Sequence, residues 1–270
     1  MNVKLDPKGV WSDILAIKNS SPLVHNITNY VVMESTANGL LAIGASPVMA
    51  HAVDEVEDMT KIANSLVLNI GTLSPAWIQA MILSLKAANF MEIPVVLDPV
   101  GVGTTPYRTK TTHSLLAHGK VAAIRGNASE IASLTDSQIT TKGVDSLLNA
   151  VDCHDQARGL ASKSKCTVWM SGATDVITDG KLSLLVHNGH PLMSKVTGMG
   201  CMATAIVGAF LAINQDTLLG CAHAAISMGV AGEIASINCK GPGSFKLEFI
   251  DALYNLSLDQ IEERIRLDVI

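Results

Sequence analysis

The sequence is poor in aromatic and in charged residues. Phe, Trp and Tyr make up 4% of the 270 residues, and Asp, Glu, Lys and Arg make up 16%. Because hydrophobic residues reach 48%, the core must consist mainly of Ala, Val, Ile, Leu and Met. This amount of apolar sequence is enough for a sizeable core. With no recognisable linker, we expect one domain spanning residues 1–270.

Dense clusters of Lys and Arg are also absent, and the net charge is −5. A nucleic-acid-binding surface needs such clusters, so we expect no nucleic-acid partner. The longest mostly apolar run, residues 203–213, is too short to span a bilayer. Residues 1–8 are polar and are followed by no signal-peptide core. These observations predict a cytoplasmic protein with no membrane partner.

The five cysteines are odd in number and show no CxxC spacing. A disulfide framework or a zinc site needs paired or regularly spaced cysteines. We therefore expect reduced thiols, as in the cytoplasm.

Apolar runs of strand length alternate with patterns of helix length. Strands are predicted at 65–70, 93–97, 121–124, 166–170, 175–178 and 182–187, the last two forming a hairpin at Asp179 and Gly180. Ser74 and Pro75 are typical of a helix start, and the last third favours helices at 201–213, 218–237 and 245–254. The alternation predicts an α/β fold with a mostly parallel sheet covered by helices on both faces.

Polar or glycine-containing segments follow the predicted strands. They lie at 71–72, 98–103, 125–127 and 171–172. The carboxyl ends of parallel strands share one edge of the sheet, where α/β proteins bind ligands. We expect these segments to converge on one site.

The segment 197–201 places Gly198 and Gly200 directly before Cys201 and an apolar helix. Glycines allow tight turns and close backbone approach to a ligand, and the N–H groups at a helix start favour anions. At that position we expect the pKa of the Cys201 thiol to be lowered. The structural alternative is a packing loop followed by a small buried cysteine.

A thiol nucleophile at Cys201 would need a histidine partner. The candidates are His187, His190 and His223, and no spacing distinguishes among them.

Asp98 ends a buried strand beside two glycines, a pattern that suits a metal or phosphate site. The alternative is a turn in which Asp98 bonds its own backbone and the glycines supply positive φ. Arg125 stands after an apolar strand, where a cation would meet a phosphate. Asn127 and Glu130 fit a capping box, and Glu130 could also orient a water bound to Mg²⁺.

A polar segment, residues 25–29, follows a short apolar run. For His25 a structural role is favoured over a general base, and the polar side chains of this segment could shape a substrate pocket. Met49 is of a type that usually belongs to the core, with pocket lining as the less common alternative.

Together these segments resemble the hydroxyethylthiazole kinase family, within the ribokinase-like superfamily, from about Pro22 to Ile237. Five motifs carry the resemblance in the family's order: VHNITNYV at 24–31, AIGASPVMA at 42–50, LDPVGVG at 97–103, IRGN at 124–127 with Glu130, and TGMGC at 197–201. Two positions depart from the family pattern. Ser171 stands where Thr is usual, which keeps the hydroxyl, and Met199 stands where Thr is common, which enlarges the loop.

The resemblance implies a ribokinase-like three-layer αβα sandwich with a central, mostly parallel sheet. It implies ATP-dependent phosphorylation of the hydroxyl of 4-methyl-5-(2-hydroxyethyl)thiazole, in thiamine biosynthesis or salvage. It further implies ATP as co-substrate, Mg²⁺ as cofactor, and a homotrimer with active sites between subunits.

The resemblance also implies the residues that meet the alcohol. Met49, Gly198 and Asn26 would bind the thiazole. Cys201 would occupy the place where most ribokinase-like enzymes have a catalytic Asp, with Gly198 and Gly200 in an anion hole at 197–201. We expect direct in-line transfer. The alternatives for Cys201 are a base, a positioning group and a covalent nucleophile.

For the nucleotide, the resemblance implies contacts from Arg125, Ser171 and Asn127. Glu130 and Asp98 would organise Mg²⁺, through water. Two functions of other classes remain as alternatives: a nucleotide-dependent dehydratase that repairs hydrated nicotinamide cofactors, and a non-catalytic nucleotide-binding module.

Overall fold

One nine-stranded sheet organises the computed structural model, which describes residues 5–135 and 149–270. The strand order is β2-β1-β3-β4-β5-β6-β7-β8-β9. Strands β1 to β6 are parallel, and β7, β8 and β9 add antiparallel pairs at one side. The strands are β1 (Leu23–Ile27), β2 (Ser46–Val48), β3 (Ser65–Asn69), β4 (Val95–Asp98), β5 (Ala123–Asn127), β6 (Thr167–Ser171), β7 (Asp175–Thr178), β8 (Ser183–Val186) and β9 (Leu267–Val269).

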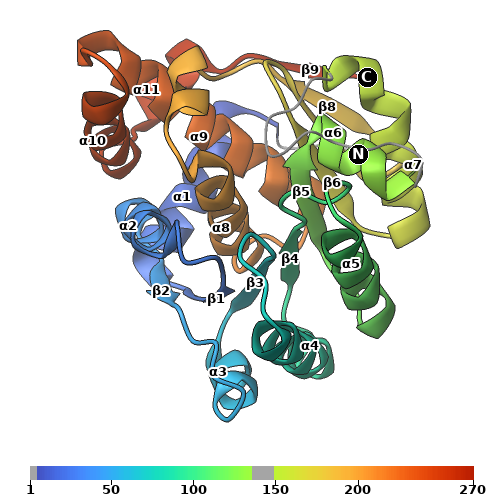
Figure 1. The fold of residues 1–270 in the computed structure, drawn as a ribbon. Coiled ribbons are helices and arrows are strands. Elements are labelled where there is room, and N and C mark those ends of the chain that lie inside the picture. Colours follow the sequence, from blue (N-terminus) through green and yellow to red (C-terminus); the bar gives the residue numbers. More distant parts are fainter. Residues whose placement is uncertain (1–4, 136–148) are drawn as a thin grey trace.

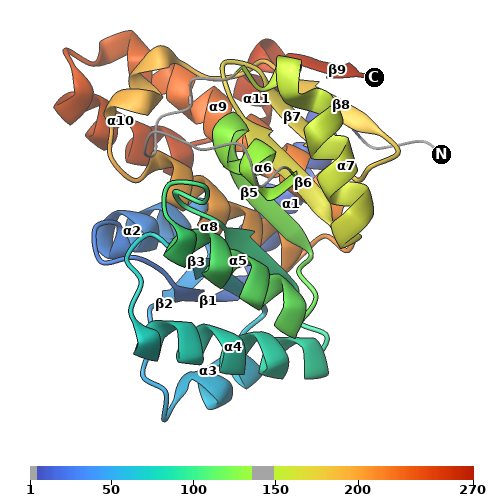
Figure 2. The same cartoon turned by 45° about the vertical axis from the view of Figure 1, so that its right-hand side comes forward.

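Helices cover both faces of the sheet (Figures 1 and 2). One face carries α1 (Pro7–Ser20), α2 (Met33–Ile43), α8 (Met199–Leu211), α9 (Thr217–Asn238), α10 (Pro242–Tyr254) and α11 (Leu258–Arg264). The other carries α3 (Val56–Ile62), α4 (Pro75–Phe90), α5 (Pro106–His118), α6 (Ala128–Thr135) and α7 (His154–Ser164). Two short 3₁₀ helices are η1 (Val151–Cys153) and η2 (Pro191–Lys195).

Side chains alternate between the two cores along each strand. On β3, Val67 packs beneath α8, whereas Leu66 and Leu68 enter the core on the opposite face. Strands buried on both faces are apolar throughout, which is why they were recognisable in the sequence. The arrangement confirms the predicted three-layer αβα sandwich.

The predicted elements agree with the structure except at their ends. Ser74 accepts a hydrogen bond from the Trp77 N–H and caps α4. Asp179 accepts from the backbone N–H groups of Lys181 and Leu182 in the predicted hairpin. Strand β5 is longer than predicted, because residues 125–127 continue the ladder with β6 and do not form a loop.

Two sequence expectations concern residues that the structure does not describe fully. Residues 1–4 of the polar N-terminal segment and residues 136–148 lie outside the described residues. The single domain over residues 1–270 therefore stays a prediction.

Within the described part of the chain, α9 is the one helix long and apolar enough to cross a membrane. Its apolar window is 83% buried inside the protein. It packs on α8 and α10 and supplies much of one core. Such burial is typical of the central helix of a soluble protein.

Helix α8 packs against the sheet at Gly208, where there is no room for a side chain. A Cβ at this position would stand 2.8 Å from Cγ2 of Val67 and 3.1 Å from Cγ1 of Val24. Both contacts are with rigid β-branched side chains on β3 and β1, which have no room to withdraw. The bare glycine therefore sets the distance between α8 and the sheet.

Gly208→Ala is expected to destabilise the protein by about 1–3 kcal/mol, the usual range for overpacking a core. Gly159→Ala is the matched control, since Gly159 is an exposed helical glycine in α7 with nothing within 4 Å of a new Cβ. There the better helix propensity of Ala should stabilise the protein by about 0.5–1 kcal/mol. Urea unfolding of both variants measures the difference, and equal stability of the two would contradict this packing.

Candidate active site

A cavity of about 790 Å³ opens at the carboxyl ends of the central strands. Asp98 of β4, Arg125 and Asn127 of β5, and Ser171 of β6 line one side of it. The opposite side is formed by residues 188–201, which lead into α8. The predicted convergence of the segments after β4, β5 and β6 is therefore confirmed.

Arg108 of α5 does not line the cavity but stabilises two segments beside it. Its guanidinium donates to the carbonyl oxygens of Ile70, Gly71 and Val100 at 2.6–2.9 Å. These carbonyls belong to the segments after β3 and β4. The predicted polar segment at 71–72 thus supports the site, although neither Gly71 nor Thr72 lines the cavity.

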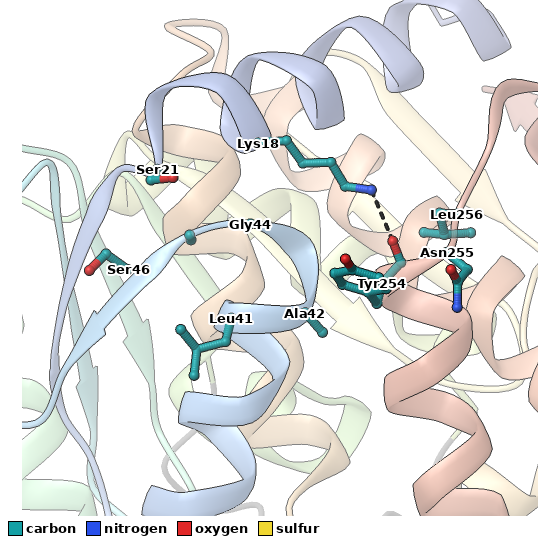
Figure 3. Close-up of a pocket in the computed structure, with 10 residues that line it drawn as sticks. Lys18, Ser21, Leu41, Ala42, Gly44, Ser46, Tyr254, Asn255 and Leu256 are labelled. Carbon is teal, nitrogen blue, oxygen red and sulfur yellow. Dashed lines mark hydrogen bonds between the residues drawn. The ribbon is translucent and has the colours of Figure 1, made fainter.

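A second cavity, of about 630 Å³, lies at the amino ends of β1 and β2 (Figure 3). Lys18 crosses it and donates from Nζ to the backbone oxygen of Tyr254 at 2.9 Å, linking α1 to α10. Its lining contains no Asp, Glu, His or Cys. The carboxylates and the cysteine that could serve phosphoryl transfer or bind a metal therefore line the first cavity.

The glycine loop 197–201 has one glycine at the N-cap of α8 and one in the first turn of the helix. Gly198 is the N-cap residue at φ +89°, and a Cβ there would stand 2.8 Å from Cγ1 of Val32. A Cβ at Gly200 would stand 2.6 Å from Nη1 of Arg125. No side chain caps the start of α8. The N–H of Met199 donates to the carbonyl of Val196, but those of Gly200 and Cys201 are available to an anion in the cavity.

Cys201 lies in the first turn of α8 and at the cavity wall. Its sulfur accepts a hydrogen bond from Nδ2 of Asn29 at 3.4 Å. Burial, reinforced by the nearby charge of Asp98, raises the pKa of the Cys201 thiol to about 12. The expected lowering of this pKa is wrong, because removal from water outweighs the helix terminus.

None of the candidate histidines is hydrogen-bonded to Cys201. His187 lies between Thr174 and Asp268, and His223 bonds Asp13 on the far face of α9. His190 lines the cavity, but its ring accepts from the N–H of Leu192. The geometry gives no cysteine–histidine pair of the kind that a thiol nucleophile uses.

Asp98 connects the sheet to α8. Its Oδ2 accepts hydrogen bonds from Nδ2 of Asn69 and from Oγ1 of Thr204, both at 2.8 Å. Burial raises the pKa of the Asp98 carboxyl, while Arg125 and these hydrogen bonds oppose the rise. The alternative of a self-bonded turn does not hold for Asp98, because its partners are side chains of β3 and α8.

Glu130 joins two neighbouring segments. Its Oε2 accepts the N–H of Asn127, whose side chain accepts the N–H of Glu130, so the predicted capping box is confirmed. Its Oε1 accepts the N–H of Gly101 in the segment after β4. Burial, with the charge of Asp98 adding to it, raises the pKa of Glu130 to about 7.

Arg125 projects from β5 into the cavity with its Cζ 5.4 Å from the centre of the Trp169 ring. Its Nε is buried and has no hydrogen-bond partner among the described residues. Asp175 lines the same cavity and accepts the N–H of Gly172. Burial raises the pKa of Asp175 to about 6.

The segment 171–175 also contains Ser171, the expected nucleotide contact. Its hydroxyl lines the cavity and is 3.4 Å from the carbonyl oxygen of Gly126.

Two residues expected to bind the alcohol lie away from the cavity of the single chain. Asn26 is 1% exposed and donates from Nδ2 to the carbonyl of Val24. Met49 is half-buried after β2, at the edge of the sheet. His25 makes buried contacts to Thr60 and to the carbonyl of Ala50, which support the structural interpretation.

Sequence reasoning missed four polar residues of the site: Asn29, Asn69, Thr204 and Asp175. Asn69 ends an apolar strand just as Asp98 does, so the same signal would have found it. Asn29 lay in the polar segment 25–29, but the spacing did not show which asparagine reaches Cys201.

Comparison with known proteins places this geometry in a family. Residues 14–259 match the model of the hydroxyethylthiazole kinase family. The chain is 51% identical to the hydroxyethylthiazole kinase of Oleidesulfovibrio alaskensis, over 94% of this chain and 95% of that protein. It is 49% identical to that of Syntrophus aciditrophicus, over 98% of both.

Solved structures agree with the sequence matches. The hydroxyethylthiazole kinase structure from Pyrococcus horikoshii superposes with a TM-score of 0.89 at 37% identity, covering 97% of this chain and 99% of that one. A ribokinase-like protein from Enterococcus faecalis has a TM-score of 0.62 at 11% identity over 94% and 90%, which shows a shared fold. With its glycine loop, buried carboxylates and near-complete coverage, the chain belongs to the hydroxyethylthiazole kinase family and is a kinase.

Proposed function

We propose that the protein transfers the γ-phosphoryl group of ATP to the hydroxyl of 4-methyl-5-(2-hydroxyethyl)thiazole, in thiamine biosynthesis or salvage in the cytoplasm. Family membership supports this reaction. The observation that carries the site assignment is the glycine loop 197–201, which opens α8 onto a cavity that also holds Asp98, Arg125 and Glu130.

In this proposal the start of α8 binds the phosphoryl group. The uncapped N–H groups of Gly200 and Cys201 and the helix dipole favour an anion there. Arg125, whose Nη1 lies beside Gly200 and whose buried Nε has no partner among the described residues, adds positive charge. Ser171 and Asn127 at the ends of β6 and β5 complete the nucleotide contacts.

The carboxylates fit a magnesium ion held mostly by phosphates and water. Mg²⁺ is usually bound through one or two protein carboxylates and keeps several waters. Asp98 and Glu130 line the cavity close enough for the charge of Asp98 to raise the pKa of Glu130. Both Glu130 oxygens already accept backbone N–H groups, so contact through water suits it. When bound, the ion would offset the negative charge of the phosphates.

Cys201 holds the place of the catalytic base but acts mainly by orienting the alcohol. With a pKa of about 12 the thiol stays protonated at neutral pH. A protonated thiol cannot remove the hydroxyl proton before transfer begins. Phosphoryl transfer through a loose transition state depends on positioning more than on a strong base. In-line transfer at this site therefore tolerates a thiol.

We propose a homotrimer in which a neighbouring subunit completes the alcohol site. Met49 does not line the cavity of the single chain. Tyr30 and Val31 lie beyond the carboxyl end of β1, the strand next to β2, and are 64% and 67% exposed. Exposed apolar side chains near the carboxyl ends of the strands support a subunit interface there.

ADP release that depends on the thiazole alcohol tests the proposed reaction. A coupled assay with ATP and Mg²⁺ is expected to show release with the alcohol and only background without it. A nucleotide-binding module would bind ATP with no such dependence. Turnover of hydrated NADH instead of the alcohol would identify a repair dehydratase and contradict the proposal.

Substitution of Cys201 tests whether phosphoryl transfer at this site needs a strong base. Cys201→Asp is expected to keep or raise kcat, because a carboxylate is a better proton acceptor at neutral pH. Cys201→Ala is expected to retain activity, with a loss below about 100-fold, the low end of what general acid–base catalysis contributes. Inactivity of both variants, with normal folding and ATP affinity, would contradict this role. A phosphocysteine in a rapid-quench digest would indicate covalent transfer.

Gly200→Ala tests the contact between the glycine loop and Arg125. The new methyl group would stand 2.6 Å from Nη1 of Arg125 and displace the guanidinium. A misplacement of this size is expected to lower kcat/KM for ATP by about 100-fold. Gly243→Ala, at an exposed position with nothing within 4 Å, is the control and should match the wild type. A Gly200→Ala enzyme with unchanged ATP kinetics would contradict the arrangement.

A further inference from the structure

We propose that Asn69 is a positioning residue for phosphoryl transfer, which holds the Cys201 sulfur through Asn29 and holds α8 through Asp98. This inference rests on the proposed function, in which Cys201 lies beside the reacting hydroxyl. No role for Asn69 follows from the glycine loop or from the capping box. The proposal comes from a buried chain of hydrogen bonds that crosses three strands and ends on α8.

Asn69 is the centre of that chain. It is the last residue of β3 and is 1% exposed. Its Oδ1 accepts from Nδ2 of Asn29 at 2.8 Å and from the N–H of Gly71 at 2.9 Å. Its Nδ2 donates to Oδ2 of Asp98 at 2.8 Å. Both the oxygen and the nitrogen of the Asn69 amide therefore have hydrogen-bond partners inside the protein.

The N–H of Gly71 fixes the direction of the bonds made by the Asn69 and Asn29 amides. A backbone N–H only donates, so the side-chain atom of Asn69 that it meets must be the oxygen. Asn29 can then offer only its nitrogen to that oxygen. The second hydrogen of the same nitrogen is left for the sulfur of Cys201, 3.4 Å away. Asn69 therefore determines that Asn29 presents a donor to the thiol.

A donor on the sulfur has two consequences for the reacting group. The hydrogen bond from Asn29 occupies one lone pair of the sulfur, so the S–H bond of Cys201 points away from Asn29. The hydrogen bond from Asn29 also favours the thiolate, and so does one from the side chain of Asn69 itself; both oppose the effect of burial on the pKa of this thiol. The orientation and the acidity of Cys201 both depend on an amide that does not line the cavity.

The second branch of the chain acts on the same helix. Asp98 accepts from Asn69 and from Thr204, which lies three residues after Cys201 on α8. Residues three apart share one face of a helix. Asn69 thus holds the first turns of α8 at two points on one face, Cys201 and Thr204.

Leucine is the informative substitution because it keeps the size of asparagine and removes the amide. In Asn69→Leu, Asn29 is no longer oriented and its donor to the sulfur is lost. The alkylation rate of Cys201 by iodoacetamide, measured by peptide mass spectrometry from pH 8 to 10, is expected to fall by about threefold or more at each pH, the effect of one lost hydrogen bond. Asn64→Leu is the control, since Asn64 precedes β3 at its opposite end and caps only the N–H of Leu23.

Kinetics separate positioning from a general structural effect. Asn69→Leu is expected to lower kcat by about tenfold or more, with KM for ATP within about twofold of the wild-type value. In a Cys201→Ala background the same substitution should cost less than about threefold, because only the branch through Asp98 and Thr204 remains for Asn69 to act on. An equal loss of kcat in both backgrounds, with an unchanged alkylation profile, would overturn the proposal.

Asn29→Leu keeps the proposal falsifiable if Asn69→Leu does not fold. It removes the donor of Asn29 to Cys201 but leaves the hydrogen bonds of Asn69, so it should slow alkylation by less than Asn69→Leu does. A wild-type alkylation profile in Asn29→Leu would overturn the proposal. Alkylation needs no turnover, so an enzyme without thiazole-dependent ADP release but with slowed alkylation refutes the proposed function and supports the role of Asn69.

Discussion

The close packing of α8 on the sheet is the constraint on which the site depends. Gly208 brings the helix against β1 and β3, and the bond from Thr204 to Asp98 fixes its position along the strands. The N-terminus of α8 consequently lies at the carboxyl edge of β3 and β4. A bulkier residue in place of Gly208 would move the glycine loop together with the helix, since both belong to one rigid element.

The charges in the cavity favour the magnesium ion that we propose for it. The lining residues include the acids Asp98, Glu130 and Asp175 against the bases Arg125 and Lys195. Burial opposes ionisation of the acids, which limits their repulsion of a phosphate. A nucleotide triphosphate would nevertheless bring several further negative charges into a site that has few positive ones. A divalent ion entering with the phosphates resolves that imbalance.

Sequence patterns predicted the layers, six of the nine strands and the edge at which the site forms, because strands buried on both faces are plainly apolar; β1, β2 and β9 were missed. The patterns failed where two effects of opposite sign compete. At Cys201 the helix terminus was expected to lower the thiol pKa, but burial dominates, and burial is not visible in a local sequence. The end of β5 was missed because Arg125 and Asn127 are polar strand residues that face a cavity. Asn29 and Asn69 are 40 residues apart and meet only through the strand order.

The two bonds of Glu130 make the segments after β4 and β5 move as one body. Its carboxyl holds the N–H of Gly101 with one oxygen and the N–H of Asn127 with the other. A ligand that displaces either segment must carry the other along or break a buried hydrogen bond. If the nucleotide contacts β5 as we propose, Glu130 connects those contacts to the turn beside Asp98, the carboxylate that anchors α8.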